Sequence, residues 1–306
     1  MNLKIVSVGE VLWDLLPSGR QLGGAPANFA YHAHALGAEA SLVSRVGKDE
    51  AGRDILRQFQ AWRLPSHLVQ VDGHAQTGLV TVALDAAGAP QYIIHEPVAW
   101  DFLELTAPAM DAARQADVIC FGSLAQRQLG SRQTVLQLVA ATSPKALRIF
   151  DVNLRQKYYS HDHILTSLAL ANVVKLNDAE LTTLTQMLGL NASLYGAVEE
   201  LVLRFDLRAV AVTCGPLGSF LFQNGRWSHL KSKPIEVADT VGAGDAFNAA
   251  LAVGLASGMA LKEIHELAND LASFVCTQSG ATPTLPDHLV RRFPQTAAAC
   301  SEEGQK

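Results

Sequence analysis

Residues 239–247 read Asp-Thr-Val-Gly-Ala-Gly-Asp-Ala-Phe and lead directly into an apolar, helix-forming stretch at 248–256. Small residues just before a helix let backbone N–H groups approach an anion, and the helix N-terminus adds partial positive charge. The Gly242–Gly244 amides are therefore suited to hold a phosphoryl group, and Asp245 in the first turn can accept a hydroxyl proton. Taken alone, the segment favours a simpler explanation, an acidic residue that caps a helix.

A second informative stretch, Gly23-Gly24-Ala-Pro-Ala-Asn28, lies near the other end of the chain. Its two glycines permit close backbone approach, and its proline suits the first turn of a helix. Asn28 would then project from the start of that helix, where a side-chain amide can bind hydroxyl groups. Asp14, which follows the first predicted strand, is a second polar group near the same sheet edge. By itself this stretch is equally well explained as an ordinary turn and helix start.

Between these stretches, apolar β-branched runs alternate with helical patterns. Strands that are apolar throughout and separated by helices belong to parallel sheets covered on both faces, so the pattern predicts a doubly wound α/β fold with a mainly parallel sheet. Ligands of such folds bind at the carboxyl ends of the strands. The expected strands are residues 5–8, 41–46, 118–121, 147–151, 173–176 and 209–213, and the expected helices are 25–36, 51–62, 132–141, 194–205 and 244–256.

Two short regions, about 11–22 and 75–96, break this rhythm with strand–turn–strand patterns. The second contains alternating runs joined by Asp85-Ala-Ala-Gly-Ala-Pro90, which is typical of a hairpin turn. Both regions predict a small β-sheet attached to the main one, either an ordinary edge hairpin or a lid over a substrate. No internal repeat or low-complexity linker is present, so we expect one domain over residues 1–306.

The 306 residues include 49% hydrophobic and 17% charged side chains, with a formal net charge of −5. This composition indicates a well-buried globular protein and argues against nucleic acid or an anionic membrane as partner, because either would need a basic face. Four scattered cysteines match no zinc or redox spacing, so reduced thiols are expected. With no signal sequence or membrane-length apolar run, we expect a cytoplasmic protein.

Two common nucleotide-binding motifs are missing from the chain. No G-x-x-x-x-G-K-[ST] run occurs, and the only Gly-Lys pair, at residues 47–48, is followed by aspartate. No G-x-G-x-x-G follows the first strand. A P-loop ATPase and an ordinary dinucleotide dehydrogenase are therefore disfavoured.

Taken together, the stretches ending at Asn28 and Asp245 resemble the two signature regions of the ribokinase-like (PfkB-type) carbohydrate kinases. Their order and separation match the family, and the resemblance spans nearly the whole chain. It implies ATP and a divalent ion, normally Mg2+, with phosphate passed to a sugar hydroxyl. It also implies a parallel α/β core with a β lid built from 11–22 and 75–96. The residues it assigns to catalysis are Asp245 as general base and Gly242, Ala243 and Gly244 as anion hole.

The resemblance extends to residues expected around the nucleotide. Asn177-Asp-Ala-Glu180 is similar to the family's N-x-x-E motif, in which Glu180 would organise magnesium through water and Asn177 would lie near the phosphates. Apart from the family, this run is simply a good helix cap. The remaining assignments are Thr213, Gly215 and Gly218 in the turn under the phosphates, Asn269 near adenine or else on the surface, and Asp239 and Val241 with residues 278–280 at a monovalent-cation (K+) site.

The sugar is suggested by Asp151-Val-Asn153-Leu-Arg155, which looks like the D-x-N-x-R run of bacterial fructokinases. Residues 11–17 and 121–125 also resemble that branch, in which Asp14 and Asn28 grip sugar hydroxyls beside Gly23 and Gly24. Arg155 offers several donors to a polyhydroxyl or anionic group, or forms an ion pair with a nearby acid.

The predicted reaction is therefore phosphorylation of fructose to fructose 6-phosphate. Ribose, a nucleoside or 2-keto-3-deoxygluconate remain alternatives, as does a non-catalytic sugar- or nucleotide-binding regulator on the same fold. A phosphorylated substrate is disfavoured, since Arg20 is the only basic residue in segments 11–22 and 75–96 apart from histidine. Two exposed β regions would leave open sheet edges, which suggests a homodimer joined through the lid.

Overall fold

The computed structural model describes residues 3–16, 19–84 and 90–294, which are built around a nine-stranded sheet. From β5 to β11 in the spatial order of this sheet, every neighbouring pair is parallel. The last two strands, β12 and β13, add an antiparallel hairpin that the sequence pattern had not marked. The order is β13 (Arg226–Leu230), β12 (Ser219–Gln223), β11 (Ala209–Thr213), β10 (Val173–Asn177), β9 (Leu147–Asp151), β8 (Val118–Gly122), β1 (Lys4–Val8), β4 (Glu39–Gly47) and β5 (Val69–Asp72).

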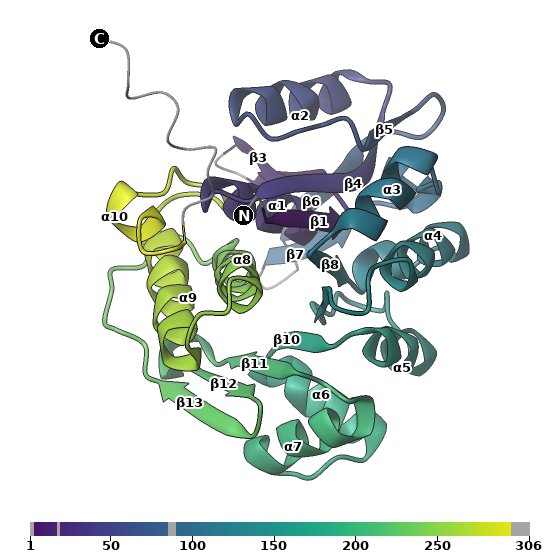
Figure 1. Ribbon diagram of the computed structural model, residues 1–306. Coiled ribbons are helices and arrows are strands. Elements are labelled where there is room, and N and C mark those ends of the chain that lie inside the picture. Colours follow the sequence, from purple (N-terminus) through teal and green to yellow (C-terminus); the bar gives the residue numbers. More distant parts are fainter. Residues whose placement is uncertain (1–2, 17–18, 85–89, 295–306) are drawn as a thin grey trace.

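Helices cover both faces of this sheet (Figure 1). Successive side chains of a strand point to opposite faces, so Ile5 enters one apolar core while Val6 and Val8 enter the other. The first core also contains α1, α8 and α9, and the second contains α3 to α7. The helices are α1 (Ala25–Ala35), α2 (Glu50–Ala61), α3 (Ala107–Gln115), α4 (Leu129–Ala140), α5 (His161–Leu170), α6 (Asp178–Leu188), α7 (Leu194–Phe205), α8 (Ala243–Ala256), α9 (Leu261–Cys276) and α10 (Asp287–Val290), with 3-10 turns η1 (Ala99–Phe102), η2 (Leu124–Gln126) and η3 (Gly215–Leu217).

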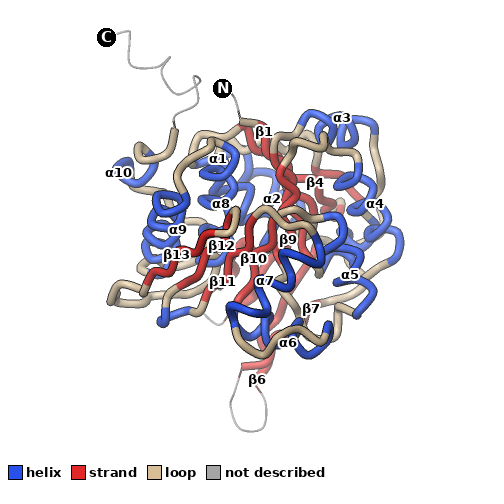
Figure 2. The backbone as a smooth tube through the Cα atoms, turned by 60° about the horizontal axis from the view of Figure 1, so that its bottom comes forward, coloured by secondary structure: helices blue, strands red, loops and turns tan. Residues whose placement is uncertain are grey.

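A second, four-stranded sheet is formed by the two regions that break the α/β rhythm. Its order is β3 (Gly19–Gly23), β2 (Leu12–Leu16), β6 (Gly78–Leu84) and β7 (Pro90–Ile94). The β2–β6 pair is parallel and the other two pairs are antiparallel. Figure 2 shows β6 extending beyond the helical layers at one end of the molecule.

The predicted fold class, a doubly wound and mainly parallel sheet with a small β-sheet, is confirmed. Parts of two sequence predictions lie outside the described residues: most of the turn at 85–90 and residues 17–18 of the region 11–22. Within the described ranges, no helix is both long and apolar enough to cross a membrane.

Helix α8 is buried along most of its length, because its sequence is apolar on nearly every side. It packs so closely on α9 that a Cβ at Gly254 would lie 2.8 Å from Ile264 Cγ1. Phe247 in its second turn is 1% exposed. The first turn of α8, which carries Asp245, is therefore held rigidly against the carboxyl end of the sheet.

Candidate active site

Asp245 lies in the first turn of α8, directly after a glycine-rich cradle. The cradle begins with Gly242, whose φ of 79° is left-handed and whose Cβ would fall 2.6 Å from Ala281. A Cβ on Gly244 would stand 3.0 Å from the Lys175 Nζ. Backbone conformation and packing therefore require glycine at residue 242, whereas at residue 244 the Lys175 ammonium faces the start of the helix.

Asn28, which was predicted to bind a sugar hydroxyl, reaches Asp245 from α1. Asn28 Nδ2 donates to Asp245 Oδ2 at 2.8 Å, although the two residues are 217 positions apart in sequence. Burial and the nearby Asp151 carboxylate raise the pKa of Asp245 to about 6, against the opposing effects of Lys175 and Asn28. Asp245 retains some solvent exposure, whereas Asn28 is only 3% exposed. This geometry leaves one reachable carboxylate whose proton affinity suits a base near neutral pH.

Asp151, predicted as a substrate contact, is instead bonded inside the protein. Its Oδ1 accepts from Lys175 Nζ at 3.2 Å and its Oδ2 from Asn248 Nδ2 at 3.3 Å. Burial acts against the charge of Lys175, but Asp151, Glu180 and Asp245 outweigh it and raise the pKa of the ammonium. Asp151 thus serves to hold a charged lysine beside the cradle.

The other predicted sugar contacts meet where the two sheets join. A Cβ on Gly23 would lie 2.1 Å from Asp14 Oδ2, and one on Gly24 would lie 2.6 Å from the Glu10 carbonyl oxygen. Gly24 also has a φ of 103°, which favours glycine. Burial raises the pKa of Asp14 to about 6, opposed by Arg155. The Gly23–Gly24 turn is therefore in direct contact with both acidic residues.

The loop that carries Arg155 is fixed by neighbours on both sides. The Asn153 carbonyl accepts from Ser123 Oγ at 3.1 Å, and the residue itself has a left-handed φ of 38°. Tyr158 Oη donates to Glu96 Oε1 at 3.0 Å, next to the small sheet. Arg155 is exposed, and within the described chain its guanidinium makes one hydrogen bond, to the Leu154 carbonyl at 3.2 Å. Its guanidinium is thus available to a ligand.

Asn177 and Glu180 form a reciprocal helix cap at the start of α6. Asn177 Oδ1 accepts from the Glu180 N–H, and Glu180 Oε2 accepts from the Asn177 N–H, each at 2.8 Å. Glu180 Oε1 also accepts from the Leu154 N–H at 3.0 Å. Burial raises the pKa of Glu180 while Lys175 opposes the shift. This carboxylate therefore ties the Arg155 loop to α6, with lone pairs left over for a water molecule.

The turn after β11 is shaped by its glycines. Gly218 has a φ of 108°, and a Cβ there would lie 2.0 Å from the Leu230 carbonyl. Gly215, with a φ of 52°, accepts from Ser232 Oγ at 2.8 Å. Thr213 Oγ1 makes a long bond of 3.5 Å to the Leu176 carbonyl. The turn thus lies at the carboxyl end of β11, as a phosphate-binding turn would.

Asn269, predicted near adenine, is engaged inside the fold. Its Oδ1 accepts from Ser219 Oγ at 2.9 Å and its Nδ2 donates to the His265 carbonyl at 2.9 Å. Ser219 also contacts His265 Nε2 at 2.8 Å. These bonds assign Asn269 to the packing of α9 against β12, and its place near adenine stays an untested prediction.

Asp239 brings together the two segments predicted to form a monovalent-cation site. Its Oδ1 accepts from the Val241 N–H at 3.0 Å and its Oδ2 from the Gly280 N–H at 3.2 Å. The same loop is held from α1, where His32 Nε2 lies 2.9 Å from the Ala281 carbonyl. Over the described ranges, no three His, Cys, Asp or Glu side chains are grouped as a metal site. Any cation here would depend on backbone oxygens.

Comparison with known proteins agrees with this arrangement. The sequence model of the pfkB family of carbohydrate kinases matches residues 18–288 of this chain. The chain belongs to the pfkB family of carbohydrate kinases. A fructokinase of Klebsiella pneumoniae is 31% identical over 304 residues, covering 94% of this chain and 97% of the relative.

Solved structures extend the comparison to the fold of this pfkB-family kinase. An uncharacterized sugar kinase of Pyrococcus horikoshii is 29% identical and superposes with a TM-score of 0.80, covering 94% of this chain and 96% of its own. The same protein has also been solved in complex with ATP. A fructokinase of Xylella fastidiosa with bound ATP shares the fold at a TM-score of 0.83 and 21% identity, covering 94% and 98%.

Three polar residues of this kinase's site were not predicted: Glu10, Lys175 and Asn248. Lys175 interrupts the apolar run at the start of β10, and Glu10 lies two positions after the last residue of β1. Charged residues are rarely buried without a partner. A charged residue inside or just after a buried parallel strand could therefore have indicated that these positions belong to a site. Asn248 lies one helical turn after Gly244 and could have been found from the i+4 spacing.

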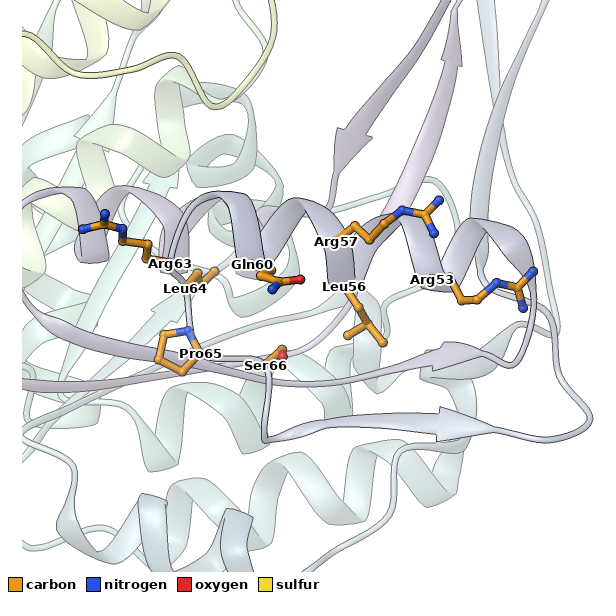
Figure 3. A pocket seen from close by; sticks show the side chains of 8 residues that line it. All are labelled: Arg53, Leu56, Arg57, Gln60, Arg63, Leu64, Pro65 and Ser66. Carbon is orange, nitrogen blue, oxygen red and sulfur yellow. The ribbon is translucent and has the colours of Figure 1, made fainter.

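A groove of about 590 Å3 lies elsewhere, along α2. Figure 3 shows Arg63 extending in the opposite direction from Arg53 and Arg57. Its lining within the described chain contains none of the predicted site residues, and Arg57 is paired with Asp54. The arginines do not converge on one point, so this groove is not the candidate active site.

Proposed function

We propose that this carbohydrate kinase transfers the terminal phosphoryl group of ATP to a hydroxyl of a neutral sugar, with D-fructose giving fructose 6-phosphate. The observation that carries the proposal is Asp245, a reachable carboxylate held by Asn28 beside the glycine cradle. Positioning of a base next to an anion hole is what transfer of phosphate to an alcohol requires.

In the proposed reaction, Asp245 is the general base. Its Oδ2 is occupied by Asn28, so the proton of the attacking sugar hydroxyl passes to Oδ1. As the new O–P bond forms, the bond to ADP breaks, and negative charge on the transferring group is met by the Gly242, Ala243 and Gly244 amides. Lys175, which faces Gly244, adds a fixed positive charge at the same place.

ATP and magnesium fit the residues present around the cradle. The gap that a Cβ would fill at Gly244 leaves room for phosphate oxygens beside Lys175, and the turn at Gly215 and Gly218 would hold the rest of the phosphate chain. Magnesium, when bound, would offset phosphate charge and keep several waters. Glu180 is suited to accept from such a water, and Asn177 would lie near the phosphates. A K+ ion beside Asp239 and Val241 remains part of the proposal.

Fructose is proposed because of the fructokinase relatives and because the free groups suit a polyol. Asp14, Asn28 and Arg155 surround the Gly23–Gly24 turn with acceptors and one flexible donor group. Ribose, a nucleoside and 2-keto-3-deoxygluconate are the alternative substrates. A regulator without turnover is the alternative function.

The test is a panel of free sugars with ATP and magnesium, followed by ADP release and by mass of the product. We expect D-fructose to give the highest kcat/KM and a monophosphorylated product. A higher kcat/KM for ribose or a nucleoside than for fructose would contradict fructose as the substrate but would still support the kinase activity. Tight sugar or nucleotide binding with no ADP release above background would establish the regulator instead.

We also propose that the small sheet is a lid and that two copies of the chain pair through it. Tyr92 and Ile93 on β7 are 54% and 47% exposed, which is high for large apolar side chains on one strand. Light scattering at micromolar concentration should give the mass of a dimer, and Ile93→Lys should convert it to a monomer. A monomeric wild-type protein at that concentration would contradict this part of the proposal.

A further inference from the structure

Glu10 lies at the joint between the two sheets, at the carboxyl end of a central strand. It follows β1 of the main sheet and precedes β2 of the small sheet by one residue. Its backbone carbonyl is in contact with Gly24, in the turn that leads to Asn28. The residue is only 3% exposed, which is rare for glutamate without a charged partner.

One oxygen of the Glu10 carboxyl is not satisfied by the protein. Its Oε2 is buried and has no hydrogen-bond partner in the part of the chain that the structure describes. Burial raises the pKa of Glu10 to about 7; a hydrogen bond from its own backbone and the Arg155 charge oppose the shift, and Asp245 and Asp151 add to it. These three charged residues belong to the proposed active site. A buried polar atom without a partner costs about 1–3 kcal/mol, so a site of this kind is normally completed by a ligand or water.

Two other unpartnered atoms lie close by in the same network. Asn28 Nδ2 donates to Asp245, and the Asn28 Oδ1 has no partner in the described chain. Asn248 Nδ2 donates to Asp151, and the Asn248 Oδ1 likewise has no partner there. With Glu10 Oε2, these are three buried acceptors, and Arg155 is the one cation that faces the acids from the surface. An excess of acceptors favours the binding of a ligand rich in hydroxyl donors. It disfavours the binding of a ligand that carries a carboxylate or phosphate.

We propose that Glu10 is a specificity-determining residue of the sugar site. Its Oε2 accepts a hydrogen bond from a sugar hydroxyl, and together with Asp14 it forms an acidic wall that discriminates against sugar acids and sugar phosphates. The proposal deepens the proposed function and rests on it.

The experiment compares wild type with Glu10→Gln at pH 8.5, where the wild-type carboxyl is ionised, so that the variant keeps the shape and removes the charge. Glu263→Gln, on an exposed residue in the first turn of α9, is the matched control. The probes are D-fructose, or whichever neutral sugar the wild-type panel selects, and 2-keto-3-deoxygluconate as the sugar acid. Sugar affinity is measured by calorimetric titration, kcat and KM by ADP release, and folding by thermal unfolding.

For Glu10→Gln we expect sugar Kd and KM to rise about 10-fold, the loss typical of a hydrogen bond to a charged group, with kcat within about threefold. Discrimination against the sugar acid should fall by about 10-fold. Glu10→Asp, which withdraws the carboxylate by one carbon but keeps its charge, should lose affinity while retaining discrimination. This split separates specificity from a merely structural role, which would lower stability and leave the ratio of the two sugars unchanged.

Unaltered sugar affinity and unaltered discrimination in a folded Glu10→Gln protein would overturn the inference and leave the kinase proposal intact. A wild-type protein that phosphorylates no sugar would overturn both. If Glu10→Gln does not fold, the Glu10→Asp result decides, and fructose affinity within twofold of wild type in that variant counts against the inference.

Discussion

The sugar side of the proposed site and the contact between α9 and β12 differ in how their polar side chains are satisfied. On the sugar side, comprising Glu10, Asn28, Asn248 and Asp245, three buried oxygens have no partner in the described chain. In the α9–β12 contact, comprising Ser219, His265 and Asn269, the side chains bond to one another at 2.8–2.9 Å.

The hydrogen bonds of the α9–β12 contact also determine which of its atoms carry the protons. Ser219 Oγ donates to Asn269 Oδ1, so the His265 Nε2 must carry the proton that it shares with Ser219. Its Nδ1 then accepts from Ser228 Oγ at 2.8 Å, and burial lowers the pKa of His265 to about 4, which keeps the ring neutral. Bonds completed inside the fold indicate a structural role, whereas incomplete ones indicate where a ligand binds.

The largest expected effect tests the sugar side. Asp245→Asn removes the proposed base but keeps the shape and one acceptor oxygen, so kcat should fall by about 10²–10⁴-fold. Sugar and ATP affinities, measured by calorimetry, should change little. Asp287→Asn, on a side chain that is 86% exposed, is the control. Full activity in Asp245→Asn would show that Asp245 is not the general base and serves only as a helix cap.

The fold was predictable because its signals are local. The apolar runs at β1, β9 and β11 and the glycine-rich helix start before α8 each specify structure within about ten residues. The two glycine segments were informative because backbone conformation and close packing allow little else there, as Gly24 and Gly242 show.

The partners of individual side chains were not predictable in the same way. Asn269 bonds Ser219 across 50 positions and Asp151 bonds Asn248 across 97, and no local pattern encodes those distances. Asn269 was therefore assigned to a ligand when its bonds are internal. Lys175 was not predicted as a site residue, because a lysine within a strand cannot be told from an ordinary strand residue until its partner, Asp151, is known.

The next effect tests the α9–β12 contact. Asn269→Ala would leave the Ser219 hydroxyl, 1% exposed, without its acceptor, so the free energy of unfolding should fall by about 1–3 kcal/mol. The KM for ATP should stay within about twofold, because no ligand contact is lost. In a double-mutant cycle with Ser219→Ala, the second substitution should cost less than it does alone. A large rise in the KM for ATP with unchanged stability would instead show that Asn269 contacts the nucleotide.

The smallest effect concerns stability rather than activity. The pKa of Asp245 is raised from 3.8 to about 6 in the folded protein, chiefly by burial, so the fold favours the protonated form. The stability linked to this group is complete below about pH 4 and is lost as the pH rises through about 6. Asp245→Asn stays neutral throughout and should therefore be more stable than wild type at pH 7.5, by on the order of 1 kcal/mol.

That gain should disappear at pH 4, where wild-type Asp245 is protonated as well. Thermal unfolding of both proteins between pH 4 and pH 8 measures the difference, and Asp287→Asn should show almost none across the same range. A gain that is constant with pH would mean that the substitution acts through packing. A loss of stability at pH 7.5 would mean that Lys175 and Asn28 stabilise the Asp245 carboxylate by more than burial destabilises it, and the sugar side would then be as well satisfied as the α9–β12 contact.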